Sequence, residues 1–194
     1  MIRSCPDDIT ETTMDAVNLA SFIEPNQHPD CCMTISQSLL KTLAGFLPRL
    51  PATVLSIGSG TGLLEALLLE LVGESLDIRG VEVSPQVNKY LAEQDMIYVG
   101  GTWDLSRQAN NADAWVFVYP RDPRLLARYL DLRSHDRLVR IIWLGPRMDW
   151  QDYKPIFGAS RFSQLTILED CGAAGYELVA IAEPPALSSK SPGS

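Results

Sequence analysis

The sequence predicts an α/β fold, a three-layer sandwich in which helices cover both faces of a mainly parallel sheet. Two observations support this prediction. Short β-rich runs alternate with amphipathic segments of helical spacing along most of the 194 residues. Several of these runs, such as AWVFV at 114–118, are apolar at every position, which is typical of strands covered on both faces.

The first half of the chain predicts helices and strands in alternation. Leu39, Leu43 and Phe46 repeat at helical spacing, and Pro48 ends that helix. A strand, a helix closed by glycine and a second strand are expected in turn at 53–57, 62–73 and 76–83. Another helix is expected at 84–94, because Ser84 is a favourable N-cap and proline takes the first helical position.

The second half continues the alternation, with strands expected at 97–99, 114–118 and 138–144. A helix over 122–132 repeats the pattern of an N-cap followed by proline, and aromatic residues at helical spacing predict a last helix over 149–157. The runs at 162–168 and 176–181 fit either a helix followed by a strand or a hairpin. Their β-rich composition and the intervening GAAG favour the hairpin.

Composition and charge exclude several kinds of partner. Sixteen basic residues against twenty-four acidic ones give a net charge of −8, so phosphate backbones are not attracted and no nucleic acid partner is expected. The polar, acidic N-terminal stretch does not resemble a signal peptide. The apolar run at 63–72 is shorter than the ~20 residues that span a bilayer. We therefore expect a cytoplasmic protein with no membrane partner.

The segment NQHPDCCM (26–33) contains groups that bind metals in other proteins. His28, Asp30, Cys31 and Cys32 lie within five residues of one another. Adjacent cysteines rarely converge on one tetrahedral ion, so no metal is expected. The four cysteines of the chain form no CxxC pair, which favours free thiols in a reducing compartment.

A glycine turn follows the first strand. Gly58, Gly60 and Gly62 open the next helix and permit a positive φ and the close approach of a ligand to the backbone. The third glycine of the dinucleotide fingerprint is replaced by Leu63, and the lysine of a P-loop is absent. Glu82 ends the neighbouring strand, where a carboxylate can accept hydrogen bonds from both hydroxyls of a ribose. Together these features predict a pocket for a nucleoside, and the lack of a basic residue favours one with a zwitterionic or cationic tail.

The stretch VLSIGSGTG, followed by GVEVSP, resembles the class I S-adenosylmethionine-dependent methyltransferases. The resemblance covers residues 34–183 in element order and implies a seven-stranded sheet with a C-terminal antiparallel hairpin. It implies S-adenosylmethionine as the cofactor, with Glu82 holding the ribose. Four residues of the turn would cradle the methionine and ribose portions: Gly58, Ser59, Gly60 and Gly62.

The same resemblance implies two further contributions to the site. The loop after the third strand would flank the adenine through Trp103 and Asp104. The end of the fourth strand would face the transferred methyl group through Tyr119 and Pro120. Tyr119 is therefore a candidate both for cofactor binding and for catalysis.

Ser56 departs from the pattern of the family. Members usually carry Asp or Glu at this position, which helps to fix the amino group of the cofactor directly or through water. A serine hydroxyl brings no charge, and a charged partner makes a hydrogen bond about twice as strong. Cofactor binding through Ser56 would therefore be weaker, would recruit another acid such as Glu65 or Glu24, or would be lost.

Three parts of the chain are expected. Residues 1–33 form a lid or cap, 34–183 a Rossmann-like methyltransferase domain, and 184–194 a small polar tail without fixed structure. Family members often build a lid over the substrate from residues before the first strand, which makes His28 a candidate general base. The helix at 63–72 is apolar nearly all round, so it needs cover on both sides, from this chain or from a second copy in a homodimer.

Three functions fit these residues. The first is methyl transfer from S-adenosylmethionine to a small-molecule acceptor, an in-line displacement at the sulfonium methyl. The second is a binding or regulatory protein that keeps the fold without methyl transfer, and the third is an isomerase or cyclase that reuses the pocket. Ser56 and the lack of a large inserted substrate cap keep the second and third open. The sequence does not disclose whether nitrogen, oxygen, sulfur or carbon would be methylated.

Overall fold

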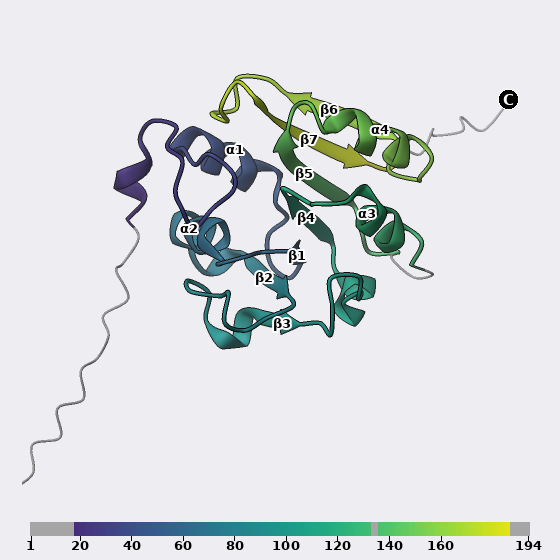
Figure 1. Ribbon diagram of the computed structural model, residues 1–194, viewed down its shortest axis with the longest axis horizontal. Coiled ribbons are helices and arrows are strands. Elements are labelled where there is room, and N and C mark those ends of the chain that lie inside the picture. Colours follow the sequence, from purple (N-terminus) through teal and green to yellow (C-terminus); the bar gives the residue numbers. More distant parts are fainter. Residues whose placement is uncertain (1–17, 133–135, 187–194) are drawn as a thin grey trace, which may run out of the picture.

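The computed structural model describes residues 18–132 and 136–186, in which strands and helices alternate as predicted (Figure 1). The strands are β1 (Thr53–Ile57), β2 (Asp77–Glu82), β3 (Met96–Tyr98), β4 (Ala114–Val118), β5 (Arg140–Pro146), β6 (Gln164–Leu168) and β7 (Glu177–Glu183). The α-helices are α1 (Gln37–Phe46), α2 (Leu63–Val72), α3 (Pro123–Leu130) and α4 (Trp150–Gly158).

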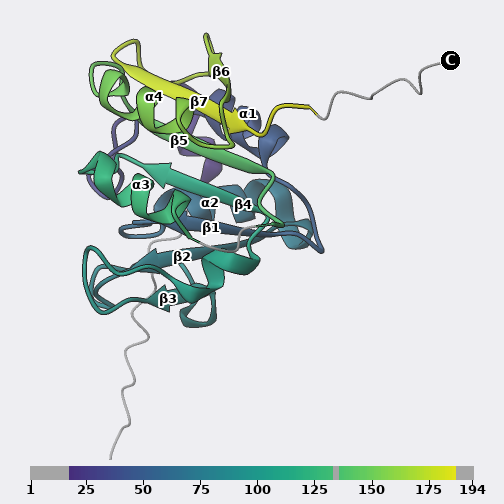
Figure 2. The same ribbon diagram turned by 90° about the vertical axis from the view of Figure 1, so that its right-hand side faces the viewer.

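The seven strands form one sheet in the order β3-β2-β1-β4-β5-β7-β6 (Figure 2). The first five pair in parallel, and β7 runs antiparallel to both β5 and β6. This confirms the predicted mainly parallel sheet and the C-terminal hairpin. The chain order reverses between β1 and β4, and ligands of open α/β sheets bind at the carboxyl ends of strands at such a reversal.

Helices cover both faces of the sheet, with α1 and α2 on one face and α3 and α4 on the other (Figure 1). Neighbouring residues of each central strand therefore enter different cores. Val54 and Val116 pack with the leucines of α1 and α2. Leu55 and Trp115 pack on the opposite face with the aromatic residues of α3 and α4. Burial on both faces explains why these strands are apolar throughout.

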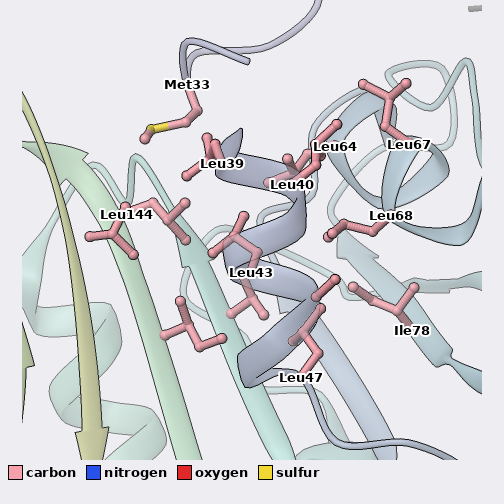
Figure 3. Packing of buried hydrophobic residues seen from close by; sticks show 14 of the residues in the cluster. Met33, Leu39, Leu40, Leu43, Leu47, Leu64, Leu67, Leu68, Ile78 and Leu144 are labelled. Carbon is pink, nitrogen blue, oxygen red and sulfur yellow. The ribbon is translucent and has the colours of Figure 1, made fainter. Parts of the chain in front are cut away.

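The apolar helix α2 receives much of its cover from within the chain. It contacts β2, α1 and the short 3-10 helix η1 (Leu19–Phe22). Figure 3 shows α1 between Leu144 of β5 on one side and Leu64 and Leu68 of α2 on the other, and all of these leucines belong to one core. The cover that the sequence required for this helix is thus supplied on this side by α1.

The prediction of a helix at 84–94 is wrong. This segment forms turns, followed only by the 3-10 turn η3 (Glu93–Asp95). The N–H groups of Lys89 and Tyr90 donate to the carbonyl of Thr61 in the glycine turn, at 2.9 and 3.1 Å. The side chain of Asn88 bonds both the N–H and the carbonyl of Leu91. These bonds take the donors that a helix would use within itself, and they hold the segment as a loop against the glycine turn.

Some expectations lie outside the described residues. Most of the predicted tail falls there, as do residues 1–17 of the expected lid and Cys5 within them. Within the described ranges, none of the helices combines the length and the apolar character that crossing a bilayer requires.

Candidate functional site

The glycine turn leaves open space above its backbone. Gly58, Gly60 and Gly62 adopt φ values of 74°, 60° and 80°, in the left-handed region that favours glycine. A Cβ built on Gly58 or Gly60 would meet nothing within 4 Å. At Gly62 it would lie 2.8 Å from Leu91, so this glycine packs closely against the loop after β2. The first two glycines are therefore the ones whose missing side chains leave room for a ligand.

Glu82 at the end of β2 is directed toward this turn. Its Oε1 accepts the N–H of Gly60 at 2.8 Å, and its Oε2 accepts the N–H of Val83 at 2.9 Å. A carboxylate oxygen has two lone pairs, so each oxygen keeps one acceptor position for a further donor. The two strand ends named from the sequence therefore meet, and their meeting point carries a carboxylate fixed by backbone bonds.

Ser56 is fully buried in β1, and its hydroxyl donates to Oε1 of Glu65 on α2. Glu65 is only 1% exposed. Burial raises its pKa to about 7, although the bond from Ser56 opposes this rise. Glu24, the other acid that the sequence offered as a substitute, is exposed. The structure thus places one carboxylate next to the serine, and it comes from the first turn of α2.

Residues 27–32 of the N-terminal segment face the glycine turn across a cavity of about 630 Å³, a size common for small-molecule sites. The carbonyl of Asp30 accepts the Thr61 hydroxyl at 2.6 Å. The Asp30 carboxylate accepts Lys89 Nζ at 2.6 Å and the Tyr90 hydroxyl at 2.7 Å, and these bonds lower its pKa. The segment is therefore tied to both loops that border the cavity.

His28 also lines this cavity, close to the ring of Phe22. Its Nδ1 accepts the N–H of Asp30 at 3.2 Å. A neutral imidazole that accepts at Nδ1 carries its proton on Nε2. While this bond holds, His28 can donate a hydrogen bond from Nε2.

Tyr119 follows β4 with a φ of 48°, an uncommon value for a residue other than glycine. Its hydroxyl donates to Oε1 of Glu177 at 2.7 Å. Burial and this bond both raise the pKa of Tyr119, so its proton is held. Glu177 is 1% exposed and also accepts the N–H groups of Thr34 and Ala174. Tyr119 does not line the cavity, whereas the residue before it, Val118, does.

The other predicted contacts lie away from the cavity wall. Trp103 is 38% exposed, and the guanidinium of Arg124 lies 4.9 Å from its ring centre. Asp104 is exposed, and its carboxylate turns back toward Gly100. Neither residue lines the cavity. Among the described residues, no three His, Cys, Asp or Glu side chains gather to hold a metal ion.

No family model and no curated protein matches the sequence, but many solved structures share its fold. The precorrin-6y C5,15-methyltransferase of Geobacter metallireducens gives a TM-score of 0.59 at 10% identity, covering 82% of this chain and 94% of that chain. A SAM-dependent methyltransferase from Aquifex aeolicus gives 0.53 at 14%, covering 74% and 88%. Human N-acetylserotonin methyltransferase, solved with SAM, gives 0.52 at 13%, covering 76% and 51%.

The chain has the class I methyltransferase fold. Within this fold, the structure brings together most of the residues that the sequence proposed for the cofactor: Ser56, Gly58, Ser59, Gly60, Gly62 and Glu82. His28 lies on the opposite wall of the same cavity. Gly58, Ser59 and Gly60 line this cavity, whereas Trp103, Asp104 and Tyr119 do not. The functional roles of all these residues stay predictions.

Two residues of this methyltransferase fold carry contacts that the sequence did not assign. The sequence offers Asp30 only as a metal ligand, whereas in the structure it ties the N-terminal segment to the loops around the cavity. Glu177 anchors Tyr119 and the same segment. The sequence does carry a signal for Glu177, because it is an acid at the start of the otherwise apolar run ELVAIA. Such a position is buried, and a buried acid needs hydrogen-bond donors.

Proposed function

We propose that the protein transfers a methyl group from S-adenosylmethionine to a small-molecule acceptor. The observation that carries this proposal is the cavity between the glycine turn and residues 27–32, with open space above Gly58 and Gly60. Glu82 at the end of β2 is bonded to the N–H of Gly60 in this turn. The fold supports it, since the neighbours include methyltransferases that depend on SAM and one solved with SAM.

The residues present fit such a cofactor. Glu82 keeps one acceptor position on each oxygen, which suits the paired hydroxyls of a ribose. Gly58 and Gly60 expose backbone where a side chain would collide with a ligand. The described wall of the cavity carries no lysine or arginine, which suits a cationic sulfonium better than a phosphate.

The cofactor would supply an electrophilic methyl group on its sulfonium sulfur. The contribution of this chain would be to hold acceptor and methyl in line and to keep water out. Positioning of this kind contributes on the order of 7–11 kcal/mol to such reactions. Residues 27–32, tied down through Asp30, form the wall that excludes water.

The acceptor class follows from the state of the two candidate bases. The Tyr119 proton is held by Glu177, and His28 uses Nδ1 to accept from the backbone. Both groups are therefore engaged in hydrogen bonds within the protein in this arrangement. The site therefore favours an acceptor whose nucleophilic atom can attack the methyl group without first losing a proton to the protein, such as an uncharged amine nitrogen or a thiolate.

A second candidate is a protein that binds the cofactor without transferring its methyl group. The same observation favours it, because a site with both candidate bases engaged does not assist a protonated acceptor. Acceptors of other neighbours with this fold include tRNA and a translation factor, so the acceptor itself has to be identified by experiment.

Thermal unfolding with and without S-adenosylmethionine tests binding. A ligand at a hundred times its dissociation constant stabilises a fold by about 2.7 kcal/mol, which raises the melting temperature of a chain of this size by roughly 5–10 °C. Gly60→Ala should lose most of this rise, because its methyl group enters the open space. Gly73→Ala is the matched control, since Gly73 also has a positive φ and open space but lies at the far end of α2.

Transfer is then measured with methyl-labelled S-adenosylmethionine and a cell extract divided into small molecules, protein and RNA. The proposal expects label in the small-molecule fraction. Label only in protein or RNA would overturn the acceptor class. Binding without any transfer would support the second candidate, and no thermal shift for the wild type would contradict both.

A further inference from the structure

Glu65 presents a buried carboxylate oxygen without a partner at the wall of the cavity. The residue lies in the first turn of α2 and is 1% exposed. Its Oε1 is held by the hydroxyl of Ser56. Its Oε2 is buried and has no hydrogen-bond partner among the described residues. Glu65 is also one of the residues that line the cavity.

This arrangement is unfavourable for an ionised carboxylate unless a cation arrives. Burying a charge costs several kcal/mol when it has no partner. The described residues that line the cavity include no lysine or arginine, and the carboxylate charge of Glu82 acts on Glu65 unfavourably. The N-terminus of α2 stabilises a negative charge, but by less than hydration stabilises a carboxylate in water. The ionised Glu65 carboxylate therefore lacks a compensating cation among the described residues that line the cavity.

We infer that Oε2 of Glu65 receives the ammonium group of an amino-acid ligand, and that Ser56 positions the carboxylate for this contact. The inference rests on the proposed function, where the ammonium is the α-amino group of the methionine portion of the cofactor. Ser56 on β1 and Glu65 on α2 together form the binding site for the ammonium group. Ser56 on β1 carries no charge, and its hydroxyl orients the carboxylate of Glu65 on α2 instead.

The N-terminal segment lies close to Glu65. Cys31 of this segment is close enough to Glu65 for the carboxylate charge to raise the pKa of its thiol further, and both residues line the cavity. Residues 27–32 form the wall opposite the glycine turn. The segment would therefore help to enclose the ammonium and the carboxylate together, away from water.

A pair of ligands that differ by one group tests the inference. S-adenosylhomocysteine carries the amino group, and its des-amino analogue keeps the carboxylate and the adenosine. A hydrogen bond to a charged group is worth enough for wild type to bind S-adenosylhomocysteine roughly 10- to 100-fold more tightly than the analogue. Glu65→Gln should reduce that preference at least about fivefold, since the amide brings no charge. Glu70→Gln, an exposed position on the same helix, should leave it unchanged.

A double variant that moves the carboxylate from α2 to β1 completes the experiment. Ser56→Asp combined with Glu65→Gln returns the charge to the same corner from β1, and should restore much of the preference. Thermal unfolding of each empty variant checks that the fold is retained. If wild type binds S-adenosylhomocysteine but shows no preference over the analogue, or if Glu65→Gln keeps the whole preference, the role of Glu65 is overturned while the proposed function stands. If wild type binds neither ligand, both are overturned.

Discussion

Replacing Glu65 by glutamine should remove a pH dependence from the stability of the empty protein. Burial is the largest cause that raises the pKa of Glu65 from its ordinary 4.5 to about 7, and the charge of Glu82 adds to it, while the Ser56 bond opposes it. The native state therefore keeps this proton to a higher pH than the unfolded chain does. The stability that results is fully present below pH 4.5 and is lost as the pH rises toward 7.

The size of the effect follows from the two pKa values. Each tenfold difference in proton affinity is worth about 1.4 kcal/mol, so the loss between pH 4.5 and 7 is about 3 kcal/mol. The neighbouring thiol of Cys31 stays neutral across this range, because burial raises its pKa to about 12. Glu65→Gln has no proton to lose and should lack this part of the pH dependence.

Urea unfolding of wild type and Glu65→Gln at closely spaced pH values measures this difference. The free energy of unfolding of wild type minus that of the variant should fall by about 3 kcal/mol between pH 4.5 and 7, then stay level. Glu70→Gln serves as an exposed control on the same helix. A difference that does not change with pH would show that Glu65 ionises as it does in water, and would refute the reasoning from its burial.

Three further predictions concern the surroundings of the cavity. Asp30→Asn should speed ligand release in stopped-flow measurements, because it weakens the bonds from Lys89 and Tyr90; an unchanged rate would contradict a closing role for this segment. Glu177→Ala should lower the free energy of urea unfolding by about 3 kcal/mol, since three donors lose their acceptor; a loss below about 1 kcal/mol would be inconsistent with this. Gly80→Ala should lower the melting temperature, because its Cβ would lie 2.5 Å from Ser59 Oγ; an unchanged value would exclude that clash.

Much of the fold could be predicted because its signals are local. The apolar runs of β1 and β4, such as Val54–Leu55 and Val116–Phe117, are buried on both faces, and such burial leaves a pattern that a short window reveals. The segment at 84–94 shows where local signals fail. Ser84 and Pro85 favour a helix start, but bonds to Thr61 across the chain decide its conformation.

The site could be predicted only in part, for the same reason. The glycines and Glu82 are recognisable because the glycines follow one strand of the predicted sheet and Glu82 ends the next. The bonds that Asp30 makes to Lys89 and Tyr90 join positions about sixty residues apart, which nothing in the local sequence announces. Glu65 was named only as one of two substitutes for an acid at Ser56, and its unpartnered oxygen becomes visible only in three dimensions.

A crystal structure of the protein grown with S-adenosylhomocysteine tests the central claim most directly. We predict that the ligand lies in the cavity over Gly58 and Gly60, with its ribose hydroxyls within hydrogen-bond distance of Glu82 and its ammonium on Glu65. An empty cavity at saturating ligand, or a ligand bound on another face with Glu82 untouched, would contradict the account.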